Sequence, residues 1–401
     1  MLTLDKIYQA SHVLRSVIRK TDLIQAPKLC PDCDLFLKTE NLQVTGSFKV
    51  RGAYYMMSQL TDEEKARGVI ACSAGNHAQG VALAAAKNHM KALICLPDGA
   101  PISKVEATKS YGAEVCMVKG VYDDAYNKAV ELQKEHNYTF VHPFDNENVI
   151  AGQGTIGLEI LDQMADVDVV IVPIGGGGLI SGVAACAKQI NPRIQIIGVQ
   201  AEGAPAIANS FRTGERTPSD TVHTIADGIA VKTPGEKTFE YIKQYVDRVV
   251  TVSDDEIASA VLLLLERCKQ VVETSGAAPL AAVLNNKVDV KGKKVVCVLS
   301  GGNIDVSFIH KIVEKGLITR CRQLKFSVLM PDAPGALEHF SHIVAQQNAN
   351  IILFQHDRVQ TDLEIGEAII HVVCEVGGVD HAKRLINTLT ADGYKVFTSQ
   401  I

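Results

Sequence analysis

The sequence predicts a parallel α/β protein followed by a smaller domain in which strands and helices have a different order. Three observations support this prediction. Short apolar runs alternate with helical patterns over the first three quarters of the chain, the chain has 401 residues, and the pattern changes near its end. Such a length exceeds one ordinary domain, so two or three domains are expected. Alternating strands and helices favour a doubly wound sheet, which binds ligands at the carboxyl ends of its strands.

The strand-like runs are short and rich in β-branched residues. They cover residues 91–96 (KALICL), 167–172 (VDVVIV), 194–199 (IQIIGV) and 294–299 (KVVCVL). Helical patterns lie between these runs, for example at 80–88 and 257–268. Because each strand and its following helix form the βα unit of a parallel sheet, we expect functional residues in the loops that follow the strands.

The end of the chain has a pattern of its own. Strands are expected at 324–330, 350–358, 366–376 and 394–399, and helices at 334–347 and 379–391. This βαββαβ order is typical of a ferredoxin-like unit. The charged residues of 316–323 favour a linker, so the sequence predicts a first domain of residues 1–315 and a C-terminal domain of residues 324–401.

The composition excludes several classes of partner. The chain has 47% hydrophobic and 21% charged residues and a net charge of −5, which gives no electrostatic reason to expect nucleic acid or an anionic membrane. The first twenty residues carry charges throughout and lack the apolar block of a signal peptide. The uncharged stretch 169–187 contains Pro173 and five glycines, which favours a buried strand and loop over a membrane helix.

Ten cysteines are scattered along the chain, and several lie in apolar runs. Buried free thiols in a reducing cytoplasm explain this distribution better than disulfides do. Cys30 and Cys33 form a CxxC pair, but no second CxxC and no HxxxH follows, so no metal site is expected there. We therefore predict a cytoplasmic protein.

Lys49 lies in the run 45–52 (TGSFKVRG) and has two interpretations. A lysine at a helix start can pack its stem on apolar neighbours and keep its charge in water, and on these residues alone this interpretation is favoured. Alternatively, an amine beside the apolar Phe48 and a second cation, Arg51, has a lowered pKa, as Schiff-base chemistry requires.

Two loops of small residues are candidates for anion binding. Residues 73–80 (SAGNHAQG) precede an alanine-rich helix, and residues 175–178 are four consecutive glycines after an apolar strand. Backbone N–H groups at such turns reach an anion without obstruction, which favours a phosphate at the glycines. The alternatives are a plain helix cap at Ser73 and a flexible linker at the glycines. The glycine run is no dinucleotide fingerprint, because Ile180 or Ser181 occupies the final glycine position.

Residues 300–303 (SGGN) form the last motif, and the Ser300 hydroxyl either meets a ligand or caps the next helix. Together, TGSFKVRGA, SAGNHAQG, GGGGL and SGGN resemble the motifs of fold-type-II pyridoxal-phosphate (PLP) enzymes, in order. The similarity covers roughly residues 1–315. It is closer to the threonine dehydratase and serine racemase branch than to cysteine synthases, whose lysine motif is built around Val-Lys-Asp. The resemblance implies two lobes with parallel twisted sheets, the small lobe of roughly 50–146 being inserted in the large one.

The resemblance also implies roles for single residues. Lys49 is expected to form the Schiff base with the cofactor, Phe48 to pack against the pyridine face, and Ser300 to face the pyridine nitrogen. Asn76 is expected to bond the phenolic oxygen. The cofactor phosphate is expected at Gly175, Gly176, Gly177, Gly178 and Leu179. The substrate carboxylate is expected at Ser73, Gly75, Asn76 and His77.

The implied reaction converts L-threonine to 2-oxobutyrate and ammonia, and L-serine to pyruvate, with Lys49 removing the Cα proton. Serine racemases carry a serine where this chain has Ala74, so the missing hydroxyl favours elimination over racemisation. Their divalent-cation site is also incomplete here, because Glu202 matches the first position but Ala208 replaces the aspartate. The alternatives are a serine dehydratase, a serine racemase-like enzyme, or a non-enzymatic amino-acid-binding protein of the same fold.

The tail resembles the ACT domain, on residues 332–337 (DAPGAL) and 348–351 (NANI). This resemblance implies that paired copies bind an amino-acid effector in a homo-oligomer, a dimer or tetramer. Isoleucine or valine is expected if the enzyme is biosynthetic. The effector contacts are expected at Asp332, Gly335, Ala336, Leu337 and Asn350. The alternative is a domain that mediates only oligomer contacts.

Overall fold

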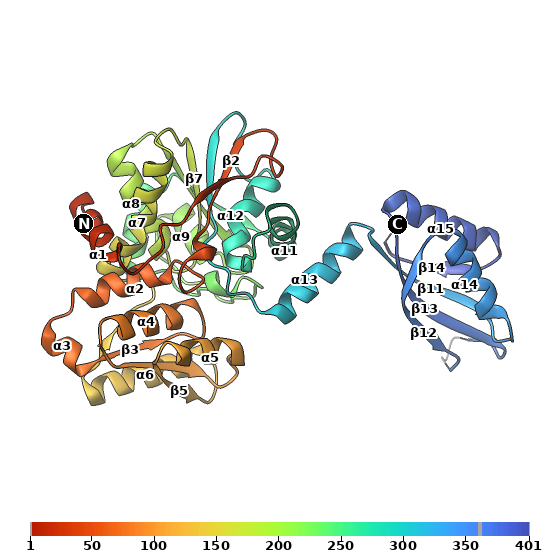
Figure 1. Cartoon of the computed structure of the whole chain (residues 1–401), viewed down its shortest axis with the longest axis horizontal. Helices are drawn as coiled ribbons and strands as arrows, with labels where there is room; N and C mark the ends of the chain where they lie inside the picture. Colours follow the sequence, from red (N-terminus) through yellow and green to blue (C-terminus); the bar gives the residue numbers. More distant parts are fainter. Residues whose placement is uncertain (1, 360–362, 401) are drawn as a thin grey trace. The chain divides into compact units, whose positions relative to one another are not determined.

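A computed structural model describes residues 2–359 and 363–400 of the chain. The chain forms two compact units, Met1–Asp305 and Val306–Ile401 (Figure 1). The first unit contains two parallel sheets, and the second contains one antiparallel sheet. The predicted α/β fold with parallel sheets is confirmed for the first unit.

The larger sheet of the first unit has six strands in the order β1-β2-β10-β7-β8-β9. They are β1 (Leu23–Gln25), β2 (Asp34–Lys38), β10 (Lys294–Val298), β7 (Val169–Pro173), β8 (Gln195–Ala201) and β9 (Arg248–Val252). All neighbours are parallel except β1 and β2. The central strand β7 is buried along its whole length, as expected for a parallel sheet covered on both faces.

The smaller sheet has four parallel strands in the order β5-β4-β3-β6. They are β3 (Val69–Cys72), β4 (Ala92–Pro97), β5 (Glu114–Val118) and β6 (Thr139–Phe140). These strands lie in sequence between β2 and β7, so the lobe that they form is inserted in the larger one, and Figure 1 shows the two lobes one above the other. Several expected strands agree with the structure to within one or two residues, including 91–96 for β4.

Helices surround these sheets, and most of them bury apolar residues in the core. In the first unit they are α1 (Leu4–Leu14), α2 (Lys49–Ser58), α3 (Asp62–Arg67), α4 (Asn76–Lys87), α5 (Ile102–Ser110), α6 (Tyr122–His136), α7 (Glu147–Gln163), α8 (Gly178–Ile190), α9 (Ala206–Thr213), α10 (Glu236–Tyr245), α11 (Asp254–Leu263) and α12 (Thr274–Leu284), with short helical turns η1 (Glu40–Leu42), η2 (Asp227–Ile229) and η3 (Leu264–Cys268). The stretch 169–187 forms β7, the glycine loop and most of α8, which agrees with the expected buried strand and loop. No helix among the described residues is long and apolar enough to span a membrane.

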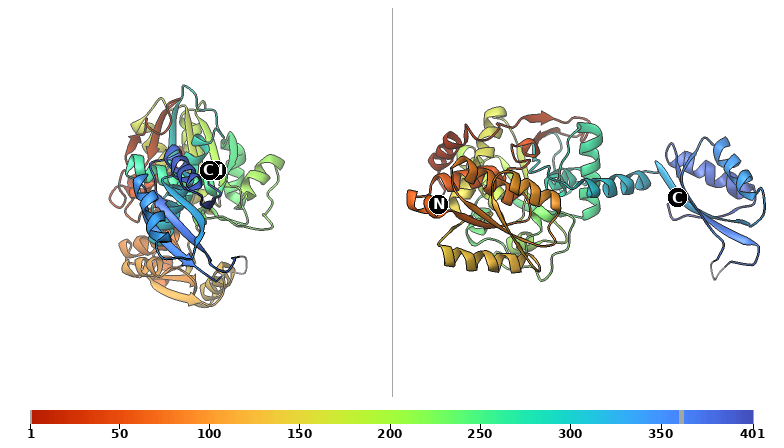
Figure 2. Two further views of the ribbon diagram at one scale, coloured as in Figure 1. Left: turned by 90° about the vertical axis from the view of Figure 1, so that its right-hand side faces the viewer. Right: turned by 60° about the horizontal axis from the view of Figure 1, so that its bottom comes forward.

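The second unit starts with α13 (Val306–Thr319) and continues in a βαββαβ order. Its elements are β11 (Gln323–Pro331), α14 (Ala336–Gln346), β12 (Asn350–Asp357), β13 (Glu367–Glu375), α15 (Val379–Ala391) and β14 (Lys395–Phe397). The sheet order is β12-β13-β11-β14, with all neighbours antiparallel. Alternate residues of β11 and β13 pack against α14 and α15, which cover one face of the sheet (Figure 2). Residues 316–323, expected to be a linker, contain the end of α13 and the first residue of β11.

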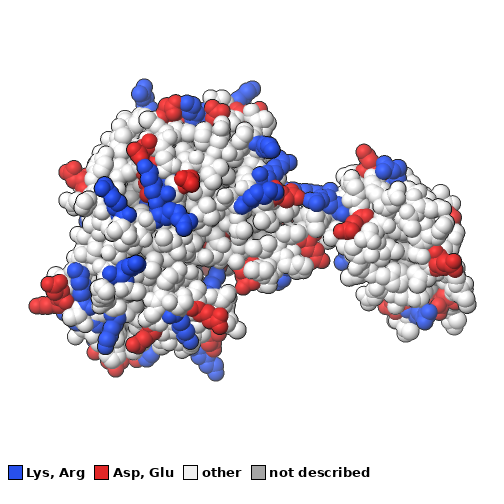
Figure 3. Space-filling view, in the orientation of Figure 1, with Lys and Arg blue, Asp and Glu red and all other residues white. Residues whose placement is uncertain are grey.

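All ten cysteines are free thiols. On the face seen in Figure 3, lysine and arginine side chains alternate with aspartate and glutamate over the first unit, without a large region of one sign. The charge distribution on this face therefore gives no reason to expect a polyanionic partner.

Candidate active site

A cavity of about 950 Å³ opens in the first unit, within the range of small-molecule sites. Three of the loops that line it come directly after parallel strands, at their carboxyl ends: Ser73 lies after β3, Gly175 after β7 and Ser300 after β10. The cavity is lined by all twelve residues expected at the cofactor and substrate: Phe48, Lys49, Ser73, Gly75, Asn76, His77, Gly175, Gly176, Gly177, Gly178, Leu179 and Ser300. The structure therefore brings together four motifs that are separated by up to 250 residues.

Lys49 is the first residue of α2, and its amine faces the cavity. Its Nζ donates a hydrogen bond to the carbonyl oxygen of Pro143 at 3.0 Å and lies 5.2 Å from the centre of the Phe48 ring. Burial lowers the pKa of Lys49 to about 8, and the nearby Glu273 carboxyl partly opposes this shift. A substantial fraction of this amine is therefore neutral, and nucleophilic, slightly above neutral pH.

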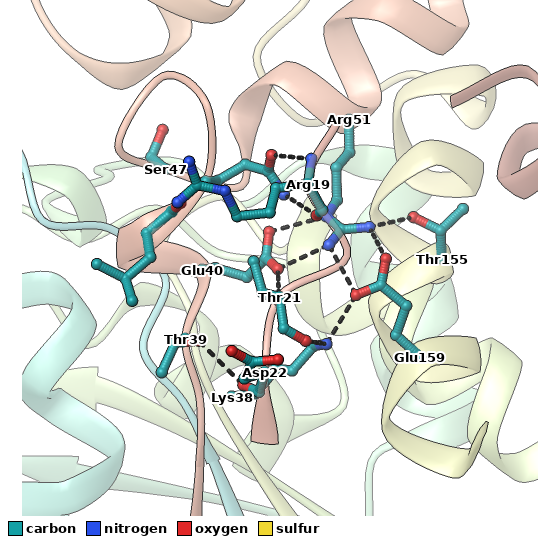
Figure 4. A network of polar contacts seen from close by, with 12 residues as sticks. Arg19, Thr21, Asp22, Lys38, Thr39, Glu40, Ser47, Arg51, Thr155 and Glu159 are labelled. Atoms are coloured by element: carbon teal, nitrogen blue, oxygen red, sulfur yellow. Dashed lines mark hydrogen bonds and ion pairs between the residues drawn. The ribbon is translucent and has the colours of Figure 1, made fainter. Parts of the chain in front are cut away.

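Arg51 does not lower the pKa of Lys49, contrary to the expectation from the sequence. Two residues along an α-helix are about 200° apart, so the two side chains leave α2 in different directions. Arg51 is fully buried and forms bidentate ion pairs with Glu40 and Glu159, with N···O distances of 2.7–3.0 Å (Figure 4). The fully buried Lys38 joins the same network through Glu159 at 2.7 Å. The second cation of the motif therefore anchors α2, and burial alone explains the lowered pKa of the amine.

The loop at Ser73 ends in a helix start without a side-chain cap. The N-cap residue of α4 is Gly75, and no side chain accepts from the first turn of this helix. Ser73 Oγ accepts instead from the N–H of Gly75 at 3.2 Å, so Ser73 is no plain helix cap. The uncapped N–H groups at this end of α4 face the cavity, where they suit an anion such as a carboxylate.

His77 contributes no cation to the cavity. Its Nε2 lies 2.8 Å from the carbonyl oxygen of Val141, which can only accept, so Nε2 carries the proton. Burial, with a smaller contribution from Lys49, lowers the pKa of His77 to about 3. The ring is therefore neutral at physiological pH and its one N–H is bonded to Val141, so the residue can donate to a carboxylate only through its backbone N–H.

The glycine loop leads into α8, which also starts without a side-chain cap. Gly177 has φ +97°, a backbone conformation that favours glycine, and a Cβ on Gly176 would lie 2.4 Å from the ring of Phe144. Thr238 Oγ1 donates to the carbonyl oxygen of Gly176 at 2.6 Å and fixes the loop on α10. The loop is a rigid turn with N–H groups directed at the cavity, and not the flexible linker that was the alternative.

Ser300 does not cap the following helix, because α13 begins six residues later at Val306. Its side chain is 3% exposed and lines the cavity, and its carbonyl oxygen accepts from the N–H of Phe48 at 3.1 Å. A second hydroxyl, Ser275 Oγ, is also buried at the cavity and has no hydrogen-bond partner among the described residues. A bound ligand with polar atoms would satisfy these groups.

The family model for "Pyridoxal-phosphate dependent enzyme" matches residues 14–301. The chain belongs to this family. It is 47% identical over 398 residues to the L-threonine ammonia-lyase of Thermotoga maritima, and 45% identical over 398 residues to that of Geobacter sulfurreducens. Each of these alignments covers 99% of both chains. The catabolic L-threonine dehydratase TdcB of Escherichia coli K12 is 46% identical over 315 residues, which are 78% of this chain and 96% of that relative.

Solved structures similar to the PLP-dependent core include a threonine deaminase and a serine racemase. Processed threonine deaminase isoform 2 of Solanum lycopersicum has a TM-score of 0.73 and 38% identity, covering 78% of this chain and 94% of the other. Maize serine racemase has a TM-score of 0.74 and 36% identity, covering 78% and 97%. The predicted family and the predicted cofactor, pyridoxal phosphate, are thereby confirmed.

The cavity of this PLP-dependent enzyme fits its cofactor. The uncapped start of α8 suits a phosphate, and Lys49 supplies an amine of lowered pKa. The unpartnered Ser275 hydroxyl and the Ser300 side chain add polar groups that a ring nitrogen or oxygen can meet. The cavity thus combines a binding site for the phosphate with the reactive amine of Lys49.

Sequence reasoning missed several residues that shape the cavity of this PLP-dependent enzyme. Asp145 accepts hydrogen bonds from the N–H groups of residues 236–238 at 2.9–3.1 Å, so it occupies the start of α10. His142 Nδ1 accepts from the N–H of Asp145 at 2.8 Å, and burial lowers the pKa of His142 to about 4. Lys104 of the small lobe and Asp227 of the large lobe both line the cavity and form an ion pair at 2.8 Å. None of these residues lies in a recognisable motif, and the contacts of Asp145 with Glu236 and of Lys104 with Asp227 join residues that are 91 and 123 positions apart.

The second unit of the enzyme does not bring its five expected effector residues together. Asp332, Gly335, Ala336 and Leu337 follow the end of β11, beside Glu367 of β13. Asn350 pairs instead with Glu375 at the other end of β13, and its Nδ2 donates to the Glu375 carboxylate at 2.9 Å. The two ends of β13 are eight residue-to-residue steps apart, roughly 27 Å at about 3.4 Å per step. One small ligand cannot contact both groups within a single copy.

The two residues compared with the divalent-cation site of serine racemases do not form a metal-binding cluster. Glu202 is half exposed and lies 3.8 Å from Lys287, and Ala208 donates its N–H to Gln200. Within residues 2–359 and 363–400, no group of three or more His, Cys, Asp and Glu side chains is arranged to hold a metal ion.

Proposed function

We propose that this enzyme converts L-threonine to 2-oxobutyrate and ammonia, and L-serine to pyruvate and ammonia. The observation that carries this proposal is the 45–47% identity, over 99% of the chain, to two L-threonine ammonia-lyases. The cavity supports it with a buried amine of lowered pKa next to two uncapped helix starts. One start suits the cofactor phosphate and the other suits the substrate carboxylate.

The residues expected at the cofactor and substrate each have a proposed part. The backbone of Gly175 to Gly178 and Leu179 would hold the phosphate, Phe48 would pack on the pyridine ring, and Ser300 would face the ring nitrogen. The backbone of 73–77 and the Ser73 hydroxyl hold the substrate carboxylate. When bound, pyridoxal phosphate supplies an electron sink for the bond that breaks at Cα. Lys49 would accept the Cα proton, and the β-hydroxyl would take up a proton and leave as water. Addition of one water would then release the nitrogen as ammonia and leave the 2-oxo acid.

The opposite face of the substrate lacks a second acid or base in this proposal. Ala74 lines the cavity where a serine racemase has a hydroxyl. Elimination is therefore favoured over return of a proton to the other face of Cα. Serine racemisation remains the second candidate activity, supported by the likeness to maize serine racemase.

The proposal is tested by assaying 2-oxobutyrate, pyruvate and D-serine with purified protein. We expect visible absorption from the bound cofactor and turnover of threonine that Lys49→Ala abolishes. The exposed Lys87, at the end of α4, provides a matched control as Lys87→Ala. Threonine turnover that survives Lys49→Ala would contradict the assignment of the base.

For the second unit, we propose that residues 324–401 form an ACT domain that binds an amino acid and changes the activity of the core. Asp332, Gly335, Ala336 and Leu337 of one copy and Asn350 of another are the proposed contacts. Gly335 has φ +88° and starts α14 without a side-chain cap, which suits an α-carboxylate. The separation of roughly 27 Å within one copy supports a site between two copies, in a homo-oligomer.

Calorimetry of the full-length protein with isoleucine, valine, threonine and serine tests effector binding, and light scattering tests the oligomer. Gly335→Val should abolish effector binding while leaving basal turnover unchanged. If none of these amino acids binds the protein or changes its kinetics, the second unit has a purely structural role.

A cytoplasmic location is also proposed for this enzyme, and cell fractionation tests it.

A further inference from the structure

Glu273 is a carboxylic acid in the wall of the cavity for which the proposed reaction has no use. It is the N-cap residue of α12, its N–H donates to the carbonyl oxygen of Gly301 at 3.0 Å, and it is 6% exposed. No side-chain hydrogen bond caps the helix at this residue. Its carboxyl therefore does not serve α12 and is directed at other groups of the cavity.

Those groups belong to Asn76, the residue expected to bond the phenolic oxygen of the cofactor. Asn76 Nδ2 donates to both carboxyl oxygens of Glu273, at 2.8 and 2.9 Å. Asn76 Oδ1 accepts from Asn303 Nδ2 at 2.8 Å, and Asn303 also donates to the carbonyl oxygen of Thr45. The chain of hydrogen bonds fixes which end of the Asn76 amide is oxygen and which is nitrogen.

The amide has one hydrogen left for a ligand. The two oxygens of one carboxyl subtend a small angle at Nδ2, so they share one of its two hydrogens. The other points elsewhere, and both Asn76 and Glu273 line the cavity. A phenolic oxygen is an acceptor, so the orientation that Glu273 imposes is the one in which Asn76 can bond it.

Gly301 leaves room for the contact between the Glu273 carboxyl and the Asn76 amide. A Cβ on Gly301 would lie 2.5 Å from Glu273 Oε1 and 3.2 Å from Asn76 Nδ2. Gly301 belongs to the SGGN motif, whose serine faces the same cavity. The glycine after Ser300 thus permits the carboxyl to reach the amide.

We propose that Glu273 is a positioning residue that orients the Asn76 amide toward the phenolic oxygen of pyridoxal phosphate, and that protonation of its carboxyl controls this contact. The inference rests on the proposed roles of the cavity residues. It adds to them a group that acts on the cofactor through Asn76.

The surroundings of Glu273 permit this control near neutral pH. Among the described residues, no lysine or arginine forms an ion pair with it. Burial raises the pKa of Glu273 to about 7, the Asn76 hydrogen bond opposes the shift, Asp227 adds to it, and Lys104 and Lys49 oppose it. An ionised carboxylate binds the Asn76 N–H more tightly than a neutral carboxyl does. The amide is therefore held more firmly above pH 7 than below it.

The test is a pH titration of the visible absorption band of the bound cofactor, between pH 5.5 and 8.5. Wild-type holoenzyme should show a transition near pH 7 that Glu273→Gln abolishes, because glutamine keeps an acceptor for Asn76 but cannot ionise. Calorimetry of cofactor binding to the apoprotein at pH 7, in two buffers of different ionisation enthalpy, should show proton exchange that differs between the two proteins by on the order of half a proton.

The matched control is Glu63→Gln, which removes an exposed carboxyl on α3 and should leave the transition unchanged. If Glu273→Gln does not fold, Glu273→Asp carries the test, since its shorter carboxyl must move the midpoint. A transition that survives unchanged in Glu273→Gln, or in a folded Glu273→Asp, overturns the inference, as does its absence from the wild type. If the wild type does not convert threonine but shows the transition, and Glu273→Gln abolishes the transition, only the proposed substrate is refuted.

Discussion

Arg51→Met tests whether the buried ion network anchors the catalytic helix. Methionine approximates the length of the arginine stem but removes all five of its hydrogen bonds, two each to Glu40 and Glu159 and one to Thr155. Glu40, which is fully buried, then keeps one side-chain donor, the Thr21 hydroxyl. Glu159 keeps Lys38 as its partner.

The magnitude follows from the uncompensated Glu40 carboxylate. Removing one partner of a buried ion pair costs about 3–5 kcal/mol, because the remaining charge stays desolvated. An unfolding entropy of roughly 2.1 cal/mol/K per residue gives about 0.64 kcal/mol/K for a unit of this size, so Tm should fall by roughly 5–8 °C. Arg51→Lys, which keeps the charge but not the bidentate geometry, should lose less.

The pH dependence gives a second check with a definite sign. In the wild type, burial raises the pKa of Glu40, but the ion pair and hydrogen bonds of Arg51 outweigh burial and hold it below its usual value. Without Arg51, burial dominates, and the folded variant binds a proton more tightly than its unfolded chain does. The Tm deficit of Arg51→Met should therefore be largest near pH 8 and shrink toward pH 5.

Scanning calorimetry of the full chain at pH 5, 6.5 and 8 provides the measurement. Arg67→Met, an exposed arginine on α3, is the matched control and should shift Tm by less than about 1 °C. The reasoning is refuted if Arg51→Met resembles this control at pH 8, or if its deficit grows as the pH falls.

Three further predictions concern the cavity. Ala74→Ser should raise the ratio of D-serine to pyruvate formed from L-serine, measured by chiral chromatography, and an unchanged ratio in an active variant would show that the hydroxyl is not sufficient. Gly176→Ala should raise the Kd for pyridoxal phosphate at least about tenfold, or about 1.4 kcal/mol, because its Cβ meets the Phe144 ring at 2.4 Å. Adding Phe144→Ala should restore part of the affinity, and no recovery would contradict the clash. The rate at which apoprotein takes up the cofactor should rise about tenfold per pH unit below pH 8 and level off above it, since only the neutral Lys49 amine reacts and burial lowers its pKa to about 8. A rate that is flat between pH 6 and 8 in stopped-flow absorbance would exclude this assignment.

Much of the core could be predicted from the sequence because the information is local. Apolar runs followed by Ser73, Gly175 and Ser300 indicated strands that end in loops of small residues. In a parallel sheet the carboxyl ends of the strands lie at one edge, so motifs far apart in sequence line one cavity. The same reasoning holds for the βαββαβ order of the tail, where alternating burial in β11 and β13 follows the strand period.

The remaining features depend on distances across the fold. The side chain of Arg51 points toward the carboxylates of Glu40 and Glu159, which come from other segments. Burial lowers the pKa of Lys49, and burial cannot be read from the residues around it in the sequence. Glu273 acquired its partner because α4 and α12 start at the same cavity, 197 residues apart in the chain. β11 and β12 are both antiparallel to β13 and therefore run in the same direction. Asp332, after the end of β11, and Asn350, at the start of β12, thus lie at opposite ends of the sheet. Local patterns were enough to place the strand ends, the loops of small residues and the amine. Which charges meet follows from packing between segments that share no local pattern, so it emerges only from the folded chain.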